Sequence, residues 1–497
     1  MSPLAPRDPR ADLPLHLNPA MTVDGAEVVG TGTPLTVYDP ATGRQLAEIP
    51  EASTEQTEAA VASARRAFPG WADLDGDRRA GHLHRLADAM EERFDRLLAT
   101  VIGEVGTPVT LAEKLQVQYP IDQLRWFADA ARTPAHRDLG TTDYGVPRRG
   151  VVYGRPVGVV AAISAYNYPL HLGMWKVGAA LAAGCTVVLM PSPRAPLAVL
   201  ELGRIAVEAG LPPGVLNVVV GGPEVGRALT EHPAVDKVSF TGSDGVGRQI
   251  VAQAAPGLKR VTLELGGKSA AIVLPGADLR AAAAALHPRY ARNAGQGCAS
   301  PTRILVHRSE LDAFLQASKP VYDSLTVGDP WRPDTVVGPV IRPEHRARIE
   351  DMVAGAVDRG ATVALGGGRP DHQDGWWVNP HLITGIGNDD PLAQEEVFGP
   401  VAVLMPYADL DEAVRTANGT RYGLSAYLQG DPVLAERIAG RLRAGTVSIN
   451  EAAGLRPDAP FGGFGHSGLG REGGEWGLAA YLEPQHVQSP LGRGGAA

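Results

Sequence analysis

Between residues 157 and 240, the chain alternates short, wholly apolar runs with longer amphipathic segments. The short runs predict buried strands, and the longer segments predict helices. The expected strands are 158–163, 186–190, 216–220 and 237–240, and the expected helices are 170–183, 196–209 and 222–229. Strands without a polar face that alternate with helices indicate a parallel sheet covered on both faces. Ligands of such sheets gather at the carboxyl ends of the strands.

The same alternation resumes after residue 300. Strands are expected at 303–306, 361–366, 400–405, 424–429 and 446–450, and helices at 310–325, 409–418 and 432–443. Asp431 and Pro432 suit the start of the last helix, because the first turn leaves the N–H that proline lacks unpaired in any case. The pattern therefore predicts an α/β fold with two lobes.

The N-terminal third of the chain follows a different pattern. Residues 1–18 are polar and proline-rich and are expected to form a loose arm. Two short strands before residue 50 and three helices, at about 53–68, 77–100 and 112–132, are expected next. Residues 141–157 alternate like one extended strand and carry basic side chains, which suggests an arm reaching outside the domain.

Composition narrows the class of protein. Of the 497 residues, 44% are hydrophobic and 20% are charged, which is typical of a globular protein with a large core. A net charge of −9 argues against nucleic acid or an anionic membrane as a partner. No apolar run is long enough for a membrane span or a signal peptide. The two cysteines, Cys185 and Cys298, predict no disulfide framework and no cysteine metal cluster, and they favour the cytoplasm.

Three short stretches contain the side chains that acyl chemistry requires. Cys298 follows two glycines in Asn-Ala-Gly-Gln-Gly-Cys-Ala-Ser (293–300). Glu264 lies at a predicted strand end in Val-Thr-Leu-Glu-Leu-Gly-Gly-Lys (261–268), and Asn167 lies at another in Ile-Ser-Ala-Tyr-Asn-Tyr-Pro-Leu (163–170). They could serve as nucleophile, base and amide donor. Taken singly, they also fit an inert buried thiol, a surface carboxylate and a turn asparagine.

Six stretches of the chain, in family order, resemble the aldehyde dehydrogenase superfamily from about residue 37 to residue 482. They are 159–170 around Asn167, Phe-Thr-Gly-Ser at 240–243, 263–268, 295–300, Glu-Glu-Val-Phe-Gly-Pro at 395–400 and Pro-Phe-Gly-Gly at 460–463. Any one of these stretches would be weak evidence. Six at suitable separations make a specific match.

The resemblance implies an enzyme that oxidises an aldehyde to a carboxylic acid with NAD(P)+, through a cysteine thiohemiacetal and a thioester. Cys298 matches the nucleophile, and Asn167 together with the Cys298 N–H matches the oxyanion site. Glu264 matches the base that activates water, and Lys176 matches a lysine near the cofactor on a possible proton path. Because relatives that acylate coenzyme A often lack an acid at the position of Glu264, a free acid is the expected product.

The resemblance also implies a set of cofactor contacts. Thr241, Gly242 and Ser243 follow a strand and start a helix, where N-terminal amides meet a pyrophosphate. Gly221 and Gly226 resemble a second glycine pair, which is shortened relative to common family versions. Glu396 matches a residue that binds the nicotinamide ribose. The remaining match is Phe398, which would pack beside that ribose and ring.

One departure from the family concerns the adenosine ribose. Relatives usually have Lys-Pro-Ser-Glu or a close variant where this chain has Met190-Pro-Ser192-Pro193-Arg194. The lysine and the acid that hold the ribose are therefore missing, and each such charge-assisted bond is worth about 1.5–3 kcal/mol. Without the acid a 2′-phosphate is not repelled, and Arg194 could attract it. The cofactor is thus either NAD or NADP, with Ser192 and Arg194 as candidate contacts.

The substrate positions are Tyr168, Trp175 and Phe461, which match residues that line the family's aldehyde tunnel. The loop 451–456 would lie near the tunnel mouth. Aromatic walls suit an apolar or aromatic aldehyde, whereas Arg456 could receive the carboxylate of a semialdehyde. In a single sequence, such aromatic residues are more often part of an ordinary core.

The family pattern divides the chain into a Rossmann-like cofactor-binding domain (19–130 and 153–266), a catalytic domain (267–466) and an oligomerisation arm (131–152 and 480–497). A homodimer or homotetramer is expected from the arm. The alternative functions are a non-catalytic family member with a degraded cofactor site, motivated by Met190 and Pro193, and a cofactor-independent thiol esterase that uses Cys298.

Overall fold

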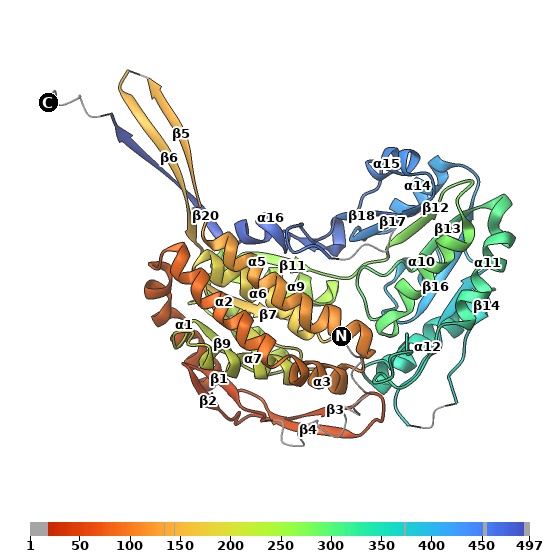
Figure 1. Cartoon of the computed structure of the whole chain (residues 1–497), viewed down its shortest axis with the longest axis horizontal. Coiled ribbons are helices and arrows are strands. Elements are labelled where there is room, and N and C mark those ends of the chain that lie inside the picture. The colour runs from red at the N-terminus through yellow and green to blue at the C-terminus, as the bar shows by residue number, and fades with distance from the viewer. Residues whose placement is uncertain (1–17, 134, 144, 372–373, 451–454, 492–497) are drawn as a thin grey trace, which may run out of the picture.

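Two sheets form the body of the molecule in a computed structural model that describes residues 18–133, 135–143, 145–371, 374–450 and 455–491 (Figure 1). The first sheet has the order β19-β11-β10-β7-β8-β9-β1-β2. Its strands are β1 (Met21–Val23), β2 (Ala26–Val28), β7 (Val159–Ile163), β8 (Thr186–Met190), β9 (Leu216–Val218), β10 (Lys237–Thr241), β11 (Arg260–Glu264) and β19 (Gly468–Leu469). Neighbours from β11 to β9 pair in parallel, and the outer strands pair antiparallel.

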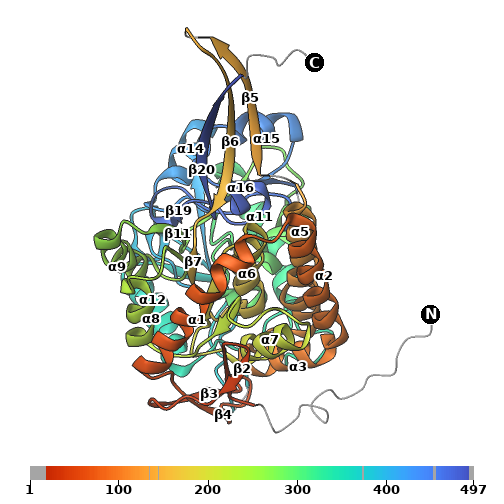
Figure 2. The ribbon, with the colours of Figure 1, turned by 90° about the vertical axis from the view of Figure 1, so that its left-hand side faces the viewer.

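Helices cover both faces of this sheet, as the continuous burial of β7 and β8 requires (Figure 2). On one face lie α1 (Thr54–Ala72), α8 (Pro223–Glu231) and α9 (Asp244–Ala254). On the other face, α6 (Pro169–Ala183) and α7 (Leu197–Glu208) are covered by α2 (Gly76–Glu92), α3 (Phe94–Val105) and α5 (Tyr119–Ala131). A separate pair, β3 (Pro34–Tyr38) and β4 (Gln45–Pro50), precedes α1.

The second sheet has the order β14-β15-β16-β13-β12-β17-β18 and is parallel except for β14. Its strands are β12 (Ala270–Val273), β13 (Arg303–His307), β14 (Thr362–Gly366), β15 (His381–Thr384), β16 (Val401–Tyr407), β17 (Ser425–Gln429) and β18 (Thr446–Ile449). The helices of this half are α10 (Leu279–Ala291), α11 (Leu311–Asp323), α12 (Pro343–Asp358), α13 (Pro391–Gln394), α14 (Leu410–Asn418) and α15 (Pro432–Ala439). The α/β class with two lobes is therefore confirmed.

A three-stranded arm projects from the body (Figure 1). It consists of β5 (His136–Asp143), β6 (Pro147–Pro156) and β20 (Leu482–Pro490), in the order β20-β6-β5. The single extended strand expected at 141–157 is instead a hairpin that turns through Gly145, whose φ of 93° favours glycine. The expected N-terminal arm at 1–17 and the last residues, 492–497, lie outside the described residues.

Several helical segments differ from the sequence pattern, among them the helix expected at 77–100, which is divided at Arg93 into α2 and α3. The helix expected at 112–132 is divided into a π-helical turn, η2 (Ala112–Gln118), and α5, after the short α4 (Val109–Leu111). Pro120 would clash with the carbonyl four residues earlier in a regular helix, and the wider turn relieves that clash. Helix α12 was not predicted, because its buried positions are sparse within a charged sequence. None of the helices in the described ranges is long and apolar enough to cross a membrane.

The remaining elements are short. They are the 3-10 turns η3 (Ala255–Gly257), η4 (Arg292–Gly295), η5 (Arg308–Glu310) and η6 (Gly465–Ser467), and the helix α16 (Gly474–Ala479). The turn η4 leads into the segment that contains Cys298, and η6 precedes the edge strand beside Glu264. Of these elements, η6 lies on the segment that joins β18 of the second sheet to β19 of the first.

Candidate active site

Two cavities meet at Cys298. The larger, of about 560 Å³, is lined by the carboxyl ends of the parallel strands of the first sheet and by the segment 396–398. The smaller, of about 60 Å³, lies on the other side of the thiol and is lined by α6, the end of α10 and Phe461. Both cavities are lined by Asn167, Leu172 and Cys298. A ligand in either cavity can therefore reach the sulfur.

A left-handed segment carries the chain from η4 to Cys298. Asn293, Ala294 and Gly295 have φ values of 53°, 53° and 71°. Only glycine fits the last position, because a Cβ on Gly295 would lie 2.0 Å from the carbonyl carbon of Gly399. The Asn293 side chain accepts a hydrogen bond from the Thr107 hydroxyl at 2.7 Å, which holds the strained backbone in place.

The Cys298 thiol is half-buried and is protonated at rest. Burial raises its pKa, and the negative charges of Glu264 and Glu396 raise it further. Backbone N–H groups of Ala299 and of Cys298 itself lower the pKa, but to a smaller extent. The thiol therefore has to lose its proton to a neighbouring base before it can act as a nucleophile.

Asn167 follows β7 and is held from three sides. Its Nδ2 donates to the Gln296 carbonyl at 3.0 Å. The Asn167 backbone carbonyl accepts hydrogen bonds from Gln116 Nε2 at 3.0 Å and from Asn293 Nδ2 at 3.1 Å. The side chain is buried and lines both cavities beside Cys298. Gln116, which lies in the π-helical turn, is a supporting residue that the sequence analysis missed.

Glu264 ends β11 and is 2% exposed. Neither of its carboxylate oxygens has a hydrogen-bond partner within the described structure. Burial raises its pKa well above the usual value, and the neighbouring Glu472 raises it further. Burial therefore disfavours the ionised form of Glu264, and both of its oxygens are free to contact water or substrate.

Lys176 lies on α6 and is completely buried, so it is not a surface lysine. Its Nζ contacts Glu472 Oε1 at 2.6 Å and the Thr241 hydroxyl at 2.5 Å. Lys176 thereby links the end of β10 to the carboxylate that acts on the pKa of Glu264. Glu472, which lies 296 positions from Lys176 in the sequence, was not predicted.

The segment 396–398 is held by the unpredicted helix α12. Arg348 donates to the Glu396 and Val397 carbonyls at 2.8 Å each, and a ring nitrogen of His345 lies 2.7 Å from the Phe398 carbonyl oxygen. Phe398 has a φ of 57° and lines the larger cavity. The Glu396 carboxylate accepts from the Gly267 N–H at 3.0 Å, and burial raises its pKa to about 7.

The phosphate-binding candidates lie at the start of α9. Thr241, Gly242 and Ser243 line the larger cavity, and Ser243 caps the helix by accepting from the Val246 N–H at 3.4 Å. A helix N-terminus that opens into a cavity binds anions through its free N–H groups. Gly221 and Gly226 do not line the cavity, although a Cβ on Gly226 would contact Met190 at 3.5 Å.

Ser192 and Arg194 line the same cavity beside Met190 and Pro193. The Arg194 guanidinium lies over the Tyr166 ring, 5.4 Å from its centroid. None of these residues supplies a carboxylate, and Arg194 adds a positive charge to the wall of the cavity. The cavity volume, the helix N-terminus and the buried acceptor Glu396 together fit a dinucleotide.

Tyr168, Trp175 and Phe461 all line the smaller cavity. The Trp175 and Phe461 rings stack with centroids 4.7 Å apart. Arg456 forms an ion pair with Asp458 at 2.8 Å on the surface, where its side chain is 74% exposed, and it does not line the cavity. Residues 451–454 of the predicted mouth loop lie outside the described structure.

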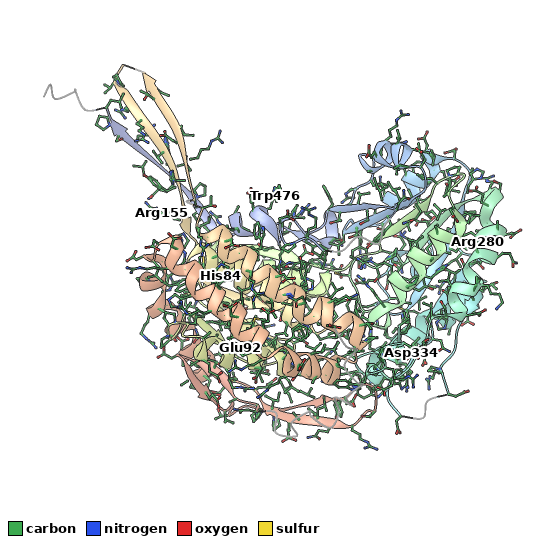
Figure 3. All side chains as sticks on the ribbon, viewed as in Figure 1. His84, Glu92, Arg155, Arg280, Asp334 and Trp476 are labelled. Atoms are coloured by element: carbon green, nitrogen blue, oxygen red, sulfur yellow. The ribbon has the colours of Figure 1, made fainter. Side chains whose placement is uncertain are left out.

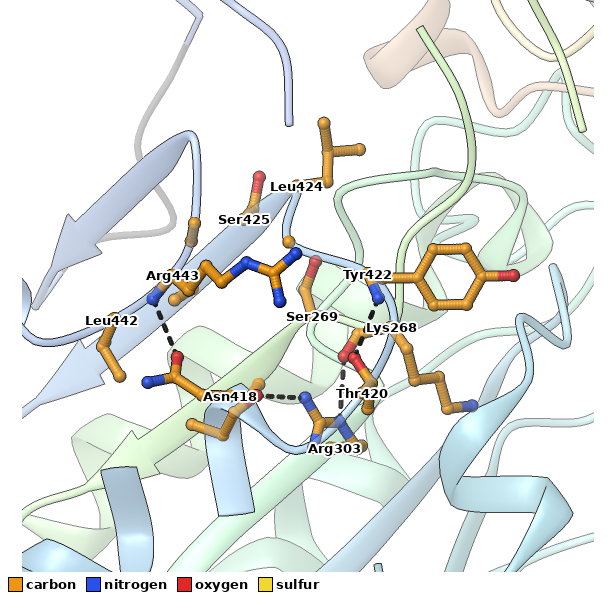
Figure 4. Close-up of a pocket in the computed structure, with 15 residues that line it drawn as sticks. Lys268, Ser269, Arg303, Asn418, Thr420, Tyr422, Leu424, Ser425, Leu442 and Arg443 are labelled. Carbon is orange, nitrogen blue, oxygen red and sulfur yellow. Dashed lines mark hydrogen bonds between the residues drawn. The ribbon is translucent and has the colours of Figure 1, made fainter. Parts of the chain in front are cut away.

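A separate, water-sized space of about 20 Å³ is lined by Lys268 and Arg303 (Figure 4). Arg303 crosses it and donates to the Lys268 carbonyl at 2.9 Å and to the Thr416 and Ala417 carbonyls at 2.6 Å each. The buried guanidinium thus fixes the loop after Glu264 to the end of α14. No group of three or more metal-binding side chains occurs among the described residues.

Comparison with known proteins gives one consistent result. The profile of the "Aldehyde dehydrogenase family" matches residues 28–487. Geranial dehydrogenase of Castellaniella defragrans and 3-succinoylsemialdehyde-pyridine dehydrogenase of a Pseudomonas species are each 40% identical, over 91% of this chain and 94% of their own. A variant of aldehyde dehydrogenase C from Pseudomonas syringae, solved with NAD+ and octanal, superposes with a TM-score of 0.90 at 37% identity, over 95% of this chain and 97% of its own.

Proposed function

Because the chain belongs to the aldehyde dehydrogenase family, we propose that Cys298, Asn167 and Glu264 perform its NAD(P)-dependent oxidation of an aldehyde to a carboxylic acid. The main support for these roles is the position of Cys298, which lies where the two cavities meet. The smaller cavity delivers the aldehyde to the sulfur from one side. The larger cavity opens on the same sulfur from the other side.

In the first step, the sulfur adds to the aldehyde carbon as a thiolate. The S–C bond forms, and the carbonyl electron pair moves to the oxygen, which becomes an oxyanion. Asn167 Nδ2 and the Cys298 N–H are the donors for that oxyanion, and losing one such donor typically costs about 10²–10³ in turnover. An ionised Glu264 is the nearby base that accepts the thiol proton, since its charge already acts on the Cys298 pKa. A reducing compartment such as the cytoplasm keeps Cys298 available as a thiol.

The larger cavity binds the dinucleotide through residues that suit its parts. Thr241 and Ser243 at the start of α9 would meet the pyrophosphate, and Glu396 would accept hydrogen bonds from the nicotinamide ribose. Phe398, fixed by α12, would pack against that ribose and ring. When bound, the nicotinamide supplies the acceptor for the hydride that leaves the aldehyde carbon.

In the last step, Glu264 takes a proton from water as the water attacks the thioester. The two unpartnered carboxylate oxygens leave room for that water. Lys176 and Glu472 form a buried pair next to Glu264, and we assign them the passage of the thiol proton away from Glu264 before water attacks, so that Glu264 is ionised again for this step. The C–S bond then breaks, the carboxylic acid leaves, and the Cys298 thiolate takes the proton from Glu264, which restores the thiol and the carboxylate.

The arm is proposed to join copies of this chain into a homodimer or homotetramer. Its two outer strands, β5 and β20, have no further strand partner among the described residues. Leu139 on β5 and Val487 on β20 are 49% and 41% exposed. An open edge with exposed apolar side chains favours association with another strand.

The proposed chemistry is tested by following the reduction of NAD+ and NADP+ with aliphatic, aromatic and carboxylated aldehydes. The purified protein is expected to reduce nucleotide with at least one aldehyde, and Cys298→Ala is expected to lose that activity because the S–C bond cannot form. Cys185→Ala is the matched control, since Cys185 is buried away from both cavities.

Two results would contradict the proposal. One is nucleotide reduction by Cys298→Ala at the rate of the unaltered protein. The other is hydrolysis of an activated ester by Cys298 without any reduction of nucleotide by the whole panel, which would favour the esterase alternative.

A further inference from the structure

A guanidinium without an anionic partner stands in the wall of the smaller cavity. Arg289 lies in the last turn of α10 and lines this cavity together with Cys298. One of its Nη atoms lies 3.3 Å from the Tyr427 hydroxyl, which is a long contact. Its Nε is enclosed and has no hydrogen-bond partner, and no ion pair is formed by Arg289 within the described structure.

Two other buried cations of this protein are compensated, whereas the buried Lys268 Nζ, like the Arg289 Nε, has no hydrogen-bond partner within the described structure. Lys176 pairs with Glu472 at 2.6 Å, and Arg303 donates to several carbonyl oxygens at 2.6–2.9 Å. Burying a charge without such partners is costly, so an uncompensated buried cation calls for an anion. Arg289 is half-buried, with an enclosed Nε, and it has no anionic partner among the described residues.

The lining of the smaller cavity contains no carboxylate. Among the described residues that form it, two are arginines and none is Asp or Glu. His171 and Trp175 contribute ring nitrogens that also lack hydrogen-bond partners. A cavity that offers cations and polar ring atoms is complementary to a ligand that carries negative charge and accepts hydrogen bonds.

The Tyr427 hydroxyl couples Arg289 to the reacting end of the site. It donates to the Ala299 carbonyl at 2.6 Å, next to Cys298 in the chain, and its oxygen faces the Arg289 Nη atom. The Tyr427 ring also lies 5.9 Å from the Arg289 guanidinium carbon. Tyr427 thus contacts both Arg289 and the loop that contains Cys298.

We propose that the smaller cavity selects aldehydes that carry a carboxylate, and that Arg289 is the residue that binds this carboxylate and determines the specificity. The inference deepens the proposed function, on which it rests. In the complex, the Arg289 Nη groups donate to the two carboxylate oxygens while the aldehyde carbon faces Cys298. The forked guanidinium suits this two-point contact better than a lysine would.

The test compares matched pairs of aldehydes that differ in charge: 4-oxobutanoate with butanal, and 4-carboxybenzaldehyde with 4-methylbenzaldehyde. The variants are Arg289→Met, which removes the charge and keeps an apolar stem, and Arg289→Lys, which keeps only the charge. Arg280→Met is the control, because Arg280 lies on the same helix but is exposed to solvent on the outside of the molecule (Figure 3).

The unaltered protein is expected to prefer the carboxylated member of at least one pair. Arg289→Met should lower kcat/KM for that member by about ten- to a hundredfold, mainly through KM, and change the uncharged member by less than about threefold. Arg289→Lys should restore part of the preference, and Arg280→Met should change neither substrate. An equal loss for both members in Arg289→Met, or no preference in the unaltered protein, would overturn the assignment.

Binding to Cys298→Ser protein separates this inference from the proposed chemistry. Calorimetric titration should give a lower Kd for 4-oxobutanoate than for butanal, and adding Arg289→Met should abolish the difference, whether or not any aldehyde is oxidised. If Arg289→Met does not fold, the Arg289→Lys protein is compared in the same titration. Equal affinities for the two ligands in the Cys298→Ser protein would refute the carboxylate site, whereas failure of nucleotide reduction alone would refute the proposed function.

Discussion

Cys298 depends on its neighbours for position, for protonation state and for access. The left-handed run from Asn293 to Gly295 places it between the two cavities, and Gly295 is required there by the close approach of Gly399. Burial and the charge of Glu264 keep the thiol protonated until a base removes its proton. A reactive thiol that is shielded at rest avoids side reactions with other electrophiles.

The residues at the adenosine end predict that NADP binds at least as tightly as NAD. Met190 and Pro193 offer no carboxylate to repel a 2′-phosphate, and Arg194 lines the cavity on the Tyr166 ring. Arg194→Gln should therefore raise the Kd for NADP by about ten- to a hundredfold and leave the Kd for NAD within about threefold. Calorimetric titration of the protein with each nucleotide measures both constants.

The control for Arg194 is Arg248→Gln, since Arg248 is exposed on α9 and does not line the cavity. It should leave both affinities unchanged. A protein that binds NAD much more tightly than NADP, with the ratio unaffected by Arg194→Gln, would contradict this account of the adenosine end.

At the residue scale, sequence motifs identified positions in the site, but their partners are distant in the chain. Cys298, Asn167 and Glu264 lie in short stretches with recognisable spacing. By contrast, Glu472 lies 296 positions from its partner Lys176 in the sequence, and Gln116 lies 51 positions from Asn167, so the fold alone brings these pairs together. The raised pKa of Glu264 could not be predicted either, because it is caused by burial and by Glu472.

At the element scale, buried strands such as β7, β8 and β16 could be predicted because they are almost wholly apolar and have helices between them, whereas the short strands β1, β2, β12, β15 and β19 were not predicted. The π-helical turn η2 and helix α12 could not be predicted, and both support the site directly. The turn carries Gln116 to the Asn167 carbonyl, and α12 fixes the segment of Glu396 and Phe398. The amphipathic signal of α12 is weak because much of its surface is charged.

The arm predicts a change of assembly when its apolar positions are made charged. Leu139→Lys together with Val487→Lys should convert the expected dimer or tetramer into a smaller species, because a lysine at a strand edge opposes pairing with another copy. Sedimentation velocity measures the mass. Val433→Lys is the control, since Val433 is 57% exposed on α15, far from the arm. An unchanged mass in the double variant would contradict the proposed role of the arm.

At the scale of the whole molecule, the site exists only where the two sheets come together. Asn167, Lys176 and Glu264 come from the first lobe, whereas Cys298 and Glu396 come from the second. Arg303 and the glycines after Glu264 hold the crossing segment in place. The expected boundary between residues 266 and 267 falls in that segment, between the last parallel strand of one sheet and β12 of the other. It stays a prediction.

The central claim is that Cys298 carries the acyl group and Glu264 drives its hydrolysis. Intact-protein mass spectrometry of Glu264→Gln, after mixing with an accepted aldehyde and nucleotide, tests it most directly. The glutamine cannot deprotonate water, so turnover should fall by about 10²–10⁴-fold. Because burial raises the Glu264 pKa, turnover of the unaltered protein should increase with pH through that pKa, and the variant should lose this dependence.

The account predicts that Glu264→Gln accumulates one acyl group on Cys298 for each nucleotide reduced, whereas Glu475→Gln, an exposed control on α16, turns over normally without an adduct. Normal turnover of Glu264→Gln, or an acyl group attached to any residue other than Cys298, would contradict it.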